Sequence, residues 1–373
     1  MKGLSVRVRL EKRQKVSLLR KILTPLAGIL LAFVLIGIVM LFLGYNPVRS
    51  YTYLFKGAVG SWTNFSETVL QSIPLIFASL GVAIALSMST MNIGAEGQYA
   101  MGAWAATAIG VFCPGIPSAL VLPLMLVCGF AAGAVWGMAA VFPRAKWDVS
   151  ETITTLMFNY IALQWINYWL FGPWRDKDSQ NLPLSPSLPA QGRFATLGGT
   201  RVHVGIFIAL VAAAVIYFVM TRTVTGYKIR VIGRSPLAAQ YAGMSIGKTM
   251  MLTMMFSGGL AGVAGVMQVG GAAGRLFPNI AGGAGYTALI IARLAKNNPL
   301  LIVLISLLFG GITQGSYSLQ MANVPWQLSE LLQGAILLCT LGGEILVSSR
   351  LVLRVQREEP AAPPLPTTDK EGA

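Results

Sequence analysis

Eight stretches of this 373-residue sequence contain no Asp, Glu, Lys or Arg, and they constrain its fold more than any other feature. They cover residues 22–48, 68–95, 97–143, 152–174, 202–221, 249–274, 276–292 and 297–329. A helix of about 20 apolar residues spans a bilayer, and most of these stretches are that long. Only 11% of all residues are charged, against roughly 25% in soluble domains. The sequence therefore predicts an all-α polytopic membrane protein and excludes an ordinary soluble enzyme.

Gly and Pro clusters and isolated charges divide the apolar runs into ten predicted membrane helices. Their ranges are 24–44, 68–88, 94–112, 118–141, 152–172, 204–221, 250–269, 283–295, 299–318 and 327–347. If the N-terminus is cytoplasmic, the inner segments carry 21 of the 28 Lys and Arg residues, as the positive-inside rule requires. Both termini are therefore predicted to be cytoplasmic. The expected organisation is a basic segment (1–21), a transmembrane permease domain (22–348) and a Pro-rich tail (349–373) that is predicted to be disordered.

The net charge of +15 does not indicate nucleic-acid binding, because nearly half of it comes from residues 1–21. That segment suits an anionic lipid surface beside the first predicted span. Residues 243–249 end like a phosphate-binding loop in Gly-Lys-Thr, but only three residues separate the two glycines instead of four. One histidine and three separated cysteines do not form a metal-ligand pattern. We therefore expect no nucleotide site, no catalytic residue and no metal site in this chain.

Polar side chains within predicted spans are costly in a bilayer, which makes them candidates for a substrate pathway. One group lies in the glycine-broken stretch 91–98 and comprises Asn92, Glu96 and Gln98. Glu96 could accept hydrogen bonds from ligand hydroxyls, or it could cap a half-helix. A second group lies on the span 152–172 and comprises Thr152, Thr155, Asn159, Gln164 and Asn167. This group suits either the hydroxyls of a neutral solute or hydrogen bonds between helices. Glu330 and Glu344 are expected at the membrane interface.

Two further patterns predict local structure. Ser235, Pro236 and Gly243 fit the N-cap, first turn and C-terminal cap of a helix of two turns on the inner side. Such a helix is too short to span a membrane and is suited to contact another chain. Gly129, Gly133 and Gly137 recur every four residues, and Gly258 and Gly262 repeat the spacing. These faces predict close packing between helices.

The stretch Asn92-Ile-Gly-Ala-Glu-Gly-Gln98, followed by Met101-Gly102-Ala103, resembles the membrane permease subunits of ABC importers. The resemblance is to the branch for branched-chain amino acids, ribose, simple sugars and nucleosides, and it runs from about residue 65 to 347. It includes Met157-Phe158-Asn159-Tyr160, the inner stretch 233–243 and Phe256 to Gly262. The stretch from Asn92 to Gln98, together with Met157-Phe158-Asn159-Tyr160, looks most like the nucleoside permeases that work with a lipoprotein binding protein.

The resemblance implies the ABC importer permease fold in a bacterial inner membrane. It also implies a cytoplasmic ATPase that binds ATP-Mg, a second permease subunit in a heterodimer, and an external solute-binding lipoprotein. This chain itself would hold no cofactor. The inner helix would be the coupling helix to the ATPase, formed by Ser235, Pro236, Ala239, Tyr241, Ala242 and Gly243.

The expected function is the inward transport of a nucleoside by alternating access, energised by the separate ATPase. Transport of a monosaccharide such as ribose or galactose is the alternative. An ion-coupled secondary transporter would be expected to carry charged relays in mid-span, and apart from Glu96 the predicted spans hold almost none.

Overall fold

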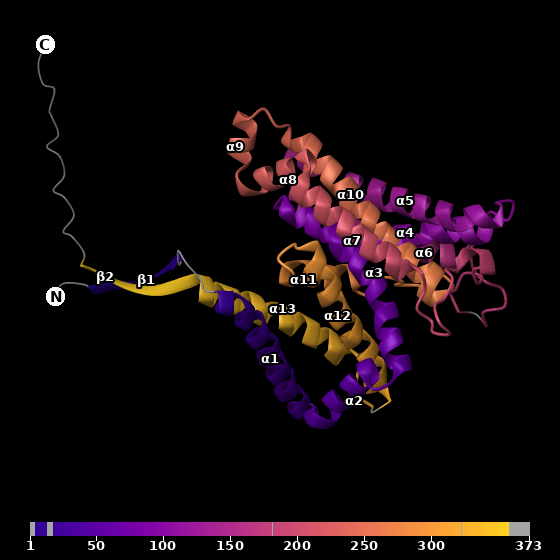
Figure 1. The fold of residues 1–373 in the computed structure, drawn as a ribbon, viewed down its shortest axis with the longest axis horizontal. Coiled ribbons are helices and arrows are strands. Elements are labelled where there is room, and N and C mark those ends of the chain that lie inside the picture. The colour runs from indigo at the N-terminus through magenta and orange to yellow at the C-terminus, as the bar shows by residue number, and fades with distance from the viewer. Residues whose placement is uncertain (1–3, 13–17, 181, 322, 358–373) are drawn as a thin grey trace, which may run out of the picture. The chain divides into compact units, whose positions relative to one another are not determined.

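The computed structural model describes residues 4–12, 18–180, 182–321 and 323–357. Apart from two paired strands, the regular elements of these residues are helices (Figure 1). In chain order the elements are β1 (Leu4–Lys12), α1 (Leu18–Phe42), α2 (Pro47–Val59), α3 (Trp62–Ser87), α4 (Ala95–Phe112), α5 (Ser118–Trp147), α6 (Glu151–Phe171), the 3-10 turn η1 (Ala190–Gly192), α7 (Gly205–Arg222), α8 (Val224–Arg234), α9 (Pro236–Tyr241), α10 (Ile246–Met267), the π-helical turn η2 (Gln268–Ala273), α11 (Ala284–Leu294), α12 (Pro299–Gln320), α13 (Gln327–Ser348) and β2 (Ser349–Arg357).

Asparagine caps and prolines fix where several helices begin. The side chain of Asn46 accepts a hydrogen bond from the N–H of Arg49 (3.2 Å), and Pro47 occupies the first turn of α2. Helix α12 begins in the same way at Asn298, which is again followed by a proline. These caps satisfy backbone amides that have no partner within the helix. Helices α2 and α8 contain charged residues, and this kept them out of the predicted spans.

Six helical segments among the described residues are long and apolar enough to cross a membrane. They are Leu23–Phe42, Trp62–Ser87, Ser118–Trp147, Gly205–Arg222, Ile246–Ala273 and Pro299–Gln320. The remaining four predicted spans coincide with α4, α6, α11 and α13. These helices exist, but they are not among the six. The multi-pass helical fold is therefore confirmed, while the count of ten spans and the cytoplasmic position of both termini stay predictions.

Helix α3 forms the centre of the unit that comprises residues 33–337. Every residue from Ser72 to Leu86 is buried, and α7, α10, α11 and α12 pack around this helix (Figure 1). Helix α10 also packs against α4 and α5. At the α5–α10 contact, a Cβ added to Gly133 would lie 2.8 Å from the Cα of Gly262. Only glycine permits backbones to approach this closely, so the predicted packing of the glycine faces is confirmed.

The two chain ends form a second unit, which is described by itself. Strands β1 and β2 pair antiparallel, in a register that runs from Leu4 opposite Arg357 to Lys12 opposite Ser349. Residues 349–357 therefore form a strand, although the sequence placed them in a disordered tail. Residues 358–373 lie outside the described part of the chain.

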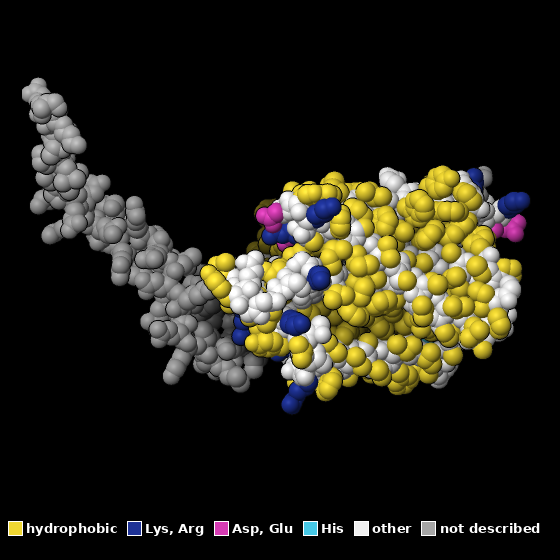
Figure 2. Space-filling model, turned by 90° about the horizontal axis from the view of Figure 1, so that it is seen from above, with side chains coloured by type: hydrophobic (Ala, Val, Ile, Leu, Met, Phe, Trp, Pro, Cys, Tyr) yellow, Lys and Arg dark blue, Asp and Glu magenta, His cyan; other side chains and the backbone are white. Residues whose placement is uncertain are grey.

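The surface of the 33–337 unit is largely apolar. Val127 on α5, Val211 on α7 and Leu304 on α12 are each more than 60% exposed. Figure 2 shows hydrophobic side chains over the middle of the face that it presents, with charged side chains gathered toward the two ends of that face. Such a surface is stable in lipid and would be an aggregation hazard in water.

Candidate functional site

Asn92, in the polar turn between α3 and α4, is buried and held by side-chain hydrogen bonds. Asn92 donates through Nδ2 to Oε1 of Gln98 (2.9 Å) and to Oγ of Ser257 on α10 (2.8 Å). Gln98 donates back through Nε2 to Oδ1 of Asn92 (3.1 Å). Neither Asn92 nor Gln98 has any exposed surface. These two predicted pathway residues therefore hold α4 to α10 and have no amide group left for a solute.

Asn159 on α6 fixes the same turn from the other side. Its Oδ1 accepts a hydrogen bond from the N–H of Gly97 (2.8 Å), and its Nδ2 donates to the carbonyl of Ile93 (2.9 Å) and to the hydroxyl of Tyr286 (3.3 Å). Thr155, one turn earlier, is fully buried and donates to the carbonyl of Glu151 within its own helix (2.7 Å). Asn159 of the second polar group thus supports the turn that carries the first group.

Glu96 joins α4 to the start of α11. Its two carboxylate oxygens accept hydrogen bonds from the N–H groups of Gly283 (2.8 Å) and Gly285 (2.7 Å). These amides lie at the N-terminus of α11, where helical N–H groups have no partner and a negative charge is stabilised. Gly283 has φ +84, a conformation that favours glycine. The capping alternative therefore describes Glu96, but the helix that it caps is α11 and not its own.

Gln164 and Asn167 do not join this group. They lie further along α6, where Asn167 donates to Gln164 (3.2 Å) and Gln164 is exposed. The structure thus brings Asn92, Glu96, Gln98, Thr155 and Asn159 together and leaves these two residues apart.

A cavity of about 770 Å³ opens beside this cluster. Glu96, Gly283 and Tyr286 lie on its wall, and its size is typical of a small-molecule site. Its polar and aromatic lining residues come from several helices and from the segment before α11: Gln71, Glu96, Tyr99, Gln268, Phe277, Asn279, Tyr286, Thr287, Thr313, Ser316, Tyr317, Gln320, Trp326, Ser329, Glu330 and Gln333. All of them belong to the 33–337 unit.

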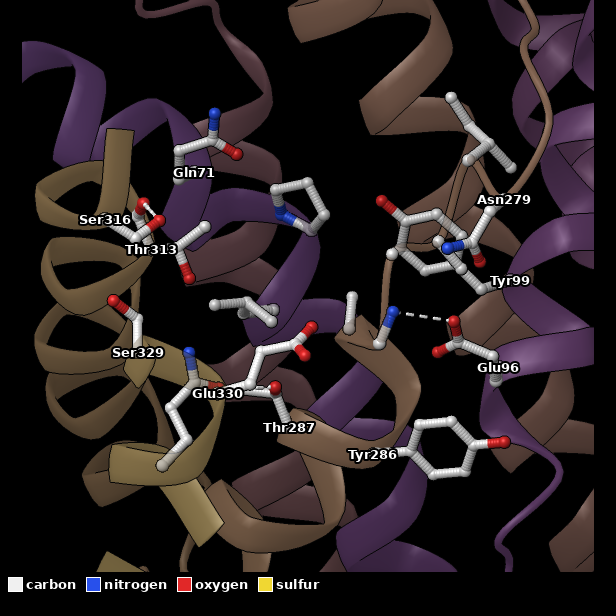
Figure 3. Close-up of a pocket in the computed structure, with 18 of the residues that line it drawn as sticks. Gln71, Glu96, Tyr99, Asn279, Tyr286, Thr287, Thr313, Ser316, Ser329 and Glu330 are labelled. Carbon is white, nitrogen blue, oxygen red and sulfur yellow. Dashed lines mark hydrogen bonds between the residues drawn. The ribbon is translucent and has the colours of Figure 1, made fainter. Parts of the chain in front are cut away.

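The polar groups stand on two sides of the cavity in Figure 3. Gln71, Thr313 and Ser316 lie on one side, and Tyr99 and Asn279 lie on the other. Among the described residues that line the cavity there is no Lys, Arg or His. The cavity therefore offers hydroxyl, amide, carboxylate and aromatic groups, but no cationic partner for an anion.

Glu330 on α13 extends into this space (Figure 3). The sequence predicts that it lies at the membrane interface, which stays a prediction, and the structure places it in the cavity lining. Its Oε1 would lie 3.9 Å from a Cβ added to Gly283, so it comes near the glycine that Glu96 holds. Unlike Glu96, it makes no hydrogen bond or ion pair with any residue in the described part of the chain.

The sequence-based prediction did not include several lining residues, because it considered polar residues in only two of the predicted spans. Thr313, Ser316 and Gln320 on α12 are spaced by three and four residues and therefore share one face. Gln71 is the single amide within the predicted span 68–88. Polar side chains are costly in every membrane span, so the same criterion applied to all apolar runs identifies these four residues.

Helix α9 has the predicted caps. Oγ of Ser235 accepts a hydrogen bond from the N–H of Ala238 (3.3 Å), Pro236 begins the helix, and Gly243 has φ +73. Ala239 is fully buried, whereas Leu237 is 69% exposed and Tyr241 is 93% exposed. The largest exposed apolar side chains of α9 are therefore those of Leu237 and Tyr241, and Pro236, Ala238 and Ala242 are exposed beside them.

The loop before α7 is fixed by a buried histidine. Nδ1 of His203 accepts a hydrogen bond from the N–H of Gly205 (3.1 Å), and the imidazole stacks on Phe194. Nε2 is buried without a partner among the described residues. Burial lowers the pKa of His203 to about 4, because desolvation disfavours the charged imidazolium.

Comparison with known proteins decides what kind of protein carries this cavity. Residues 64–341 match the family described as "Branched-chain amino acid transport system / permease component". The chain belongs to this family. It is therefore a multi-pass ABC transporter permease, a component that is not itself an enzyme. Permeases of this family imply an ATPase and a solute-binding protein as partners.

Three relatives are similar over most of the chain. The glucose ABC transporter permease protein TsgB13 of Haloferax volcanii is 31% identical over 96% of this chain and 97% of its own length. The guanosine ABC transporter permease protein NupP of Bacillus subtilis is 32% identical over 86% and 93%. The nucleoside ABC transporter permease protein NupB of Lactococcus lactis is 30% identical over 85% and 90%. The permease is thus of the nucleoside and sugar type.

Proposed function

We propose that this permease carries a nucleoside into the cell across a bacterial inner membrane by alternating access. The cavity beside Glu96 would be part of its pathway. Asn92, Gln98, Thr155 and Asn159 would hold the cavity wall in place through the hydrogen bonds described above. Gln164 and Asn167 have no part in this proposal, because they do not line the cavity.

The lining of the cavity is the observation that carries this proposal. Tyr286, Tyr317 and Trp326 expose between 39% and 52% of their surface and line the cavity, where they could stack on a nucleobase. Thr313 and Ser316 supply hydroxyls for a ribose. The carboxylate of a branched-chain amino acid would find only neutral hydrogen-bond donors there, because the lining has no cation among its described residues. Two of the relatives above are named for nucleoside or guanosine transport.

A monosaccharide is the second candidate, favoured by the similarity to the glucose permease over nearly the full chain. Hexoses use the same hydroxyl and carboxylate partners and can also stack on aromatic rings. The experiment compares uptake of labelled guanosine and labelled glucose in cells with and without this chain, each in the presence of the other solute in excess. We expect guanosine uptake to depend on the chain and to be unchanged by an excess of glucose. Chain-dependent glucose uptake that resists guanosine would overturn the nucleoside assignment.

The energy for transport would come from a separate cytoplasmic ATPase that binds ATP-Mg, with α9 as the coupling helix. Leu237 and Tyr241 would insert into a cleft of the ATPase, since burying two large side chains would stabilise the contact by several kcal/mol at about 25 cal/mol per Å². A second, different permease subunit and an external solute-binding lipoprotein would complete the importer. The chain itself would need no cofactor.

A further inference from the structure

Glu330 is a carboxylate with no assigned partner in a cavity where the other polar groups are neutral or already bonded. Both carboxylate oxygens of Glu96 already accept hydrogen bonds from the N–H groups of Gly283 and Gly285. Thr287 donates to Oε1 of Gln333 (2.8 Å), so the Thr287 hydroxyl proton and the Gln333 carbonyl oxygen are paired with each other. Both oxygens of Glu330 remain free to accept hydrogen bonds from something in the cavity.

A carboxylate without a protein partner favours ligands that carry hydrogen-bond donors. It accepts hydrogen bonds and donates none, and its two oxygens can accept from two neighbouring O–H groups at once. Such charge-assisted bonds are shorter and stronger than neutral ones. A solute that places two adjacent hydroxyls beside Glu330 would be bound, and a phosphate or carboxylate at the same position would be repelled.

We propose that Glu330 binds a pair of vicinal hydroxyls on the ring of a neutral solute. The proposal rests on the transport function proposed above and names the group that this site recognises. The vicinal pair is present in the ribose of a nucleoside and in a hexose. Ser329 precedes Glu330 in the lining, and Thr313 and Ser316 face the cavity from α12, so the ring would have further hydroxyl partners. The exposed rings of Tyr317 and Trp326 would take its apolar part.

The test uses the complete importer, with its binding protein, second permease and ATPase unchanged. Saturating uptake rates are measured for guanosine and 2′-deoxyguanosine, and for glucose and its 2-, 3- and 4-deoxy analogues, in the wild type and in Glu330→Gln. Because only the permease is altered, any change in the ratio between a solute and its deoxy analogue arises from this chain. Glu330→Gln keeps the shape of the side chain but replaces one acceptor oxygen by a donor.

We expect the ratio of guanosine to 2′-deoxyguanosine uptake to fall about tenfold in Glu330→Gln, since a hydrogen bond to a charged group is lost. Glu330→Asp should keep part of the preference. Glu67→Gln, which changes a carboxylate paired with Arg201 outside the cavity (3.2 Å), should leave the ratio unchanged. If hexoses are the solutes, the ratio should fall for glucose and one of its deoxy analogues instead.

An equal loss of uptake for each solute and its deoxy analogue would overturn the proposal, since it would assign Glu330 a structural role. An unchanged ratio at normal membrane abundance would overturn it as well. Both results leave the transport function standing. Failure of the wild-type importer to take up either class of solute would instead reject the proposed function.

Discussion

Two glutamates line one cavity but differ in their hydrogen bonds, and this difference decides what each of them can do. Glu96 is 2% exposed and is held by two backbone N–H groups, whereas Glu330 has no partner in the described part of the chain. The sequence could identify Glu96, because it interrupts a long apolar run. It could not identify Glu330 as a cavity residue, because an acid at the end of a span is typical of an interface. The role of Glu330 depends on the position of α13 beside α11, and no local sequence pattern predicts that position.

Glu96→Gln should destabilise the protein, because a neutral amide offers one acceptor where the carboxylate offers two. Hydrogen bonds to a charged group contribute about 1.5 to 3 kcal/mol each, so we expect a loss of about 2 kcal/mol. Thermal unfolding in detergent measures this loss as a lower melting temperature. Glu67→Gln is the control, because Arg201, its partner, is 65% exposed and exposed pairs contribute about 0 to 1 kcal/mol. Equal melting temperatures for the two variants would contradict the assigned cap.

His203 should make stability depend on pH. Its pKa is about 4 in the folded chain against an ordinary value of 6.5, so the unfolded chain binds more protons between these values. The free energy of unfolding should therefore fall as the pH is lowered from about 6.5 toward 4, by up to about 3 kcal/mol. His203→Asn, which can still accept from the N–H of Gly205, should flatten this dependence. The same pH profile in the variant and the wild type would show that other groups cause it.

At the scale of elements, the sequence predicted those features of the fold that local chemistry controls. Charge-free runs located all ten predicted helices, and the Ser-Pro and Gly signals located α9. Helix α2 was missed because Arg49 and Lys56 removed it from the apolar runs. Packing changed the reading of α9: Ala239 looked like a small contact residue, but it faces its own chain and is fully buried. Leu237 and Tyr241 are the large apolar side chains of α9 that a partner can reach.

Leu237→Asp should abolish ATP-driven uptake while the chain still inserts at normal abundance. A charge at this exposed position would have to be desolvated in the ATPase cleft, whereas the isolated permease would tolerate it in water. Co-purification of the ATPase and solute uptake are measured on the same cells. Gln240→Ala, at another exposed position of α9, should be nearly silent. Normal uptake in Leu237→Asp would reject α9 as the coupling helix.

At the scale of the whole molecule, the membrane orientation was predicted from charge alone. Six segments are long and apolar enough to span, while α4, α6, α11 and α13 are not among them. The cavity could not be predicted, because its wall is assembled from segments between Gln71 and Gly334. A sequence pattern identifies residues that are unusual in their local context. It does not show which residues far apart in the sequence come together in the fold.

A tag inserted between Gly198 and Gly199 should be external, and a C-terminal tag should be cytoplasmic. Both glycines have positive φ and open space around them, so an insertion there should not disturb packing. Protease accessibility in intact cells and in inverted vesicles measures the two positions. Both tags on the same side would contradict the charge-based orientation and the count of ten spans.

The central claim is that this chain forms the nucleoside pathway of an ATP-driven importer. The most direct test reconstitutes the chain with its ATPase, second permease and binding protein in liposomes, and follows labelled guanosine with ATP-Mg or ADP-Mg on the ATPase side. We expect guanosine accumulation that requires both ATP-Mg and this chain. GMP should neither compete with guanosine nor be transported itself. Accumulation driven by an ion gradient without ATP, or transport of a branched-chain amino acid in place of guanosine, would contradict it.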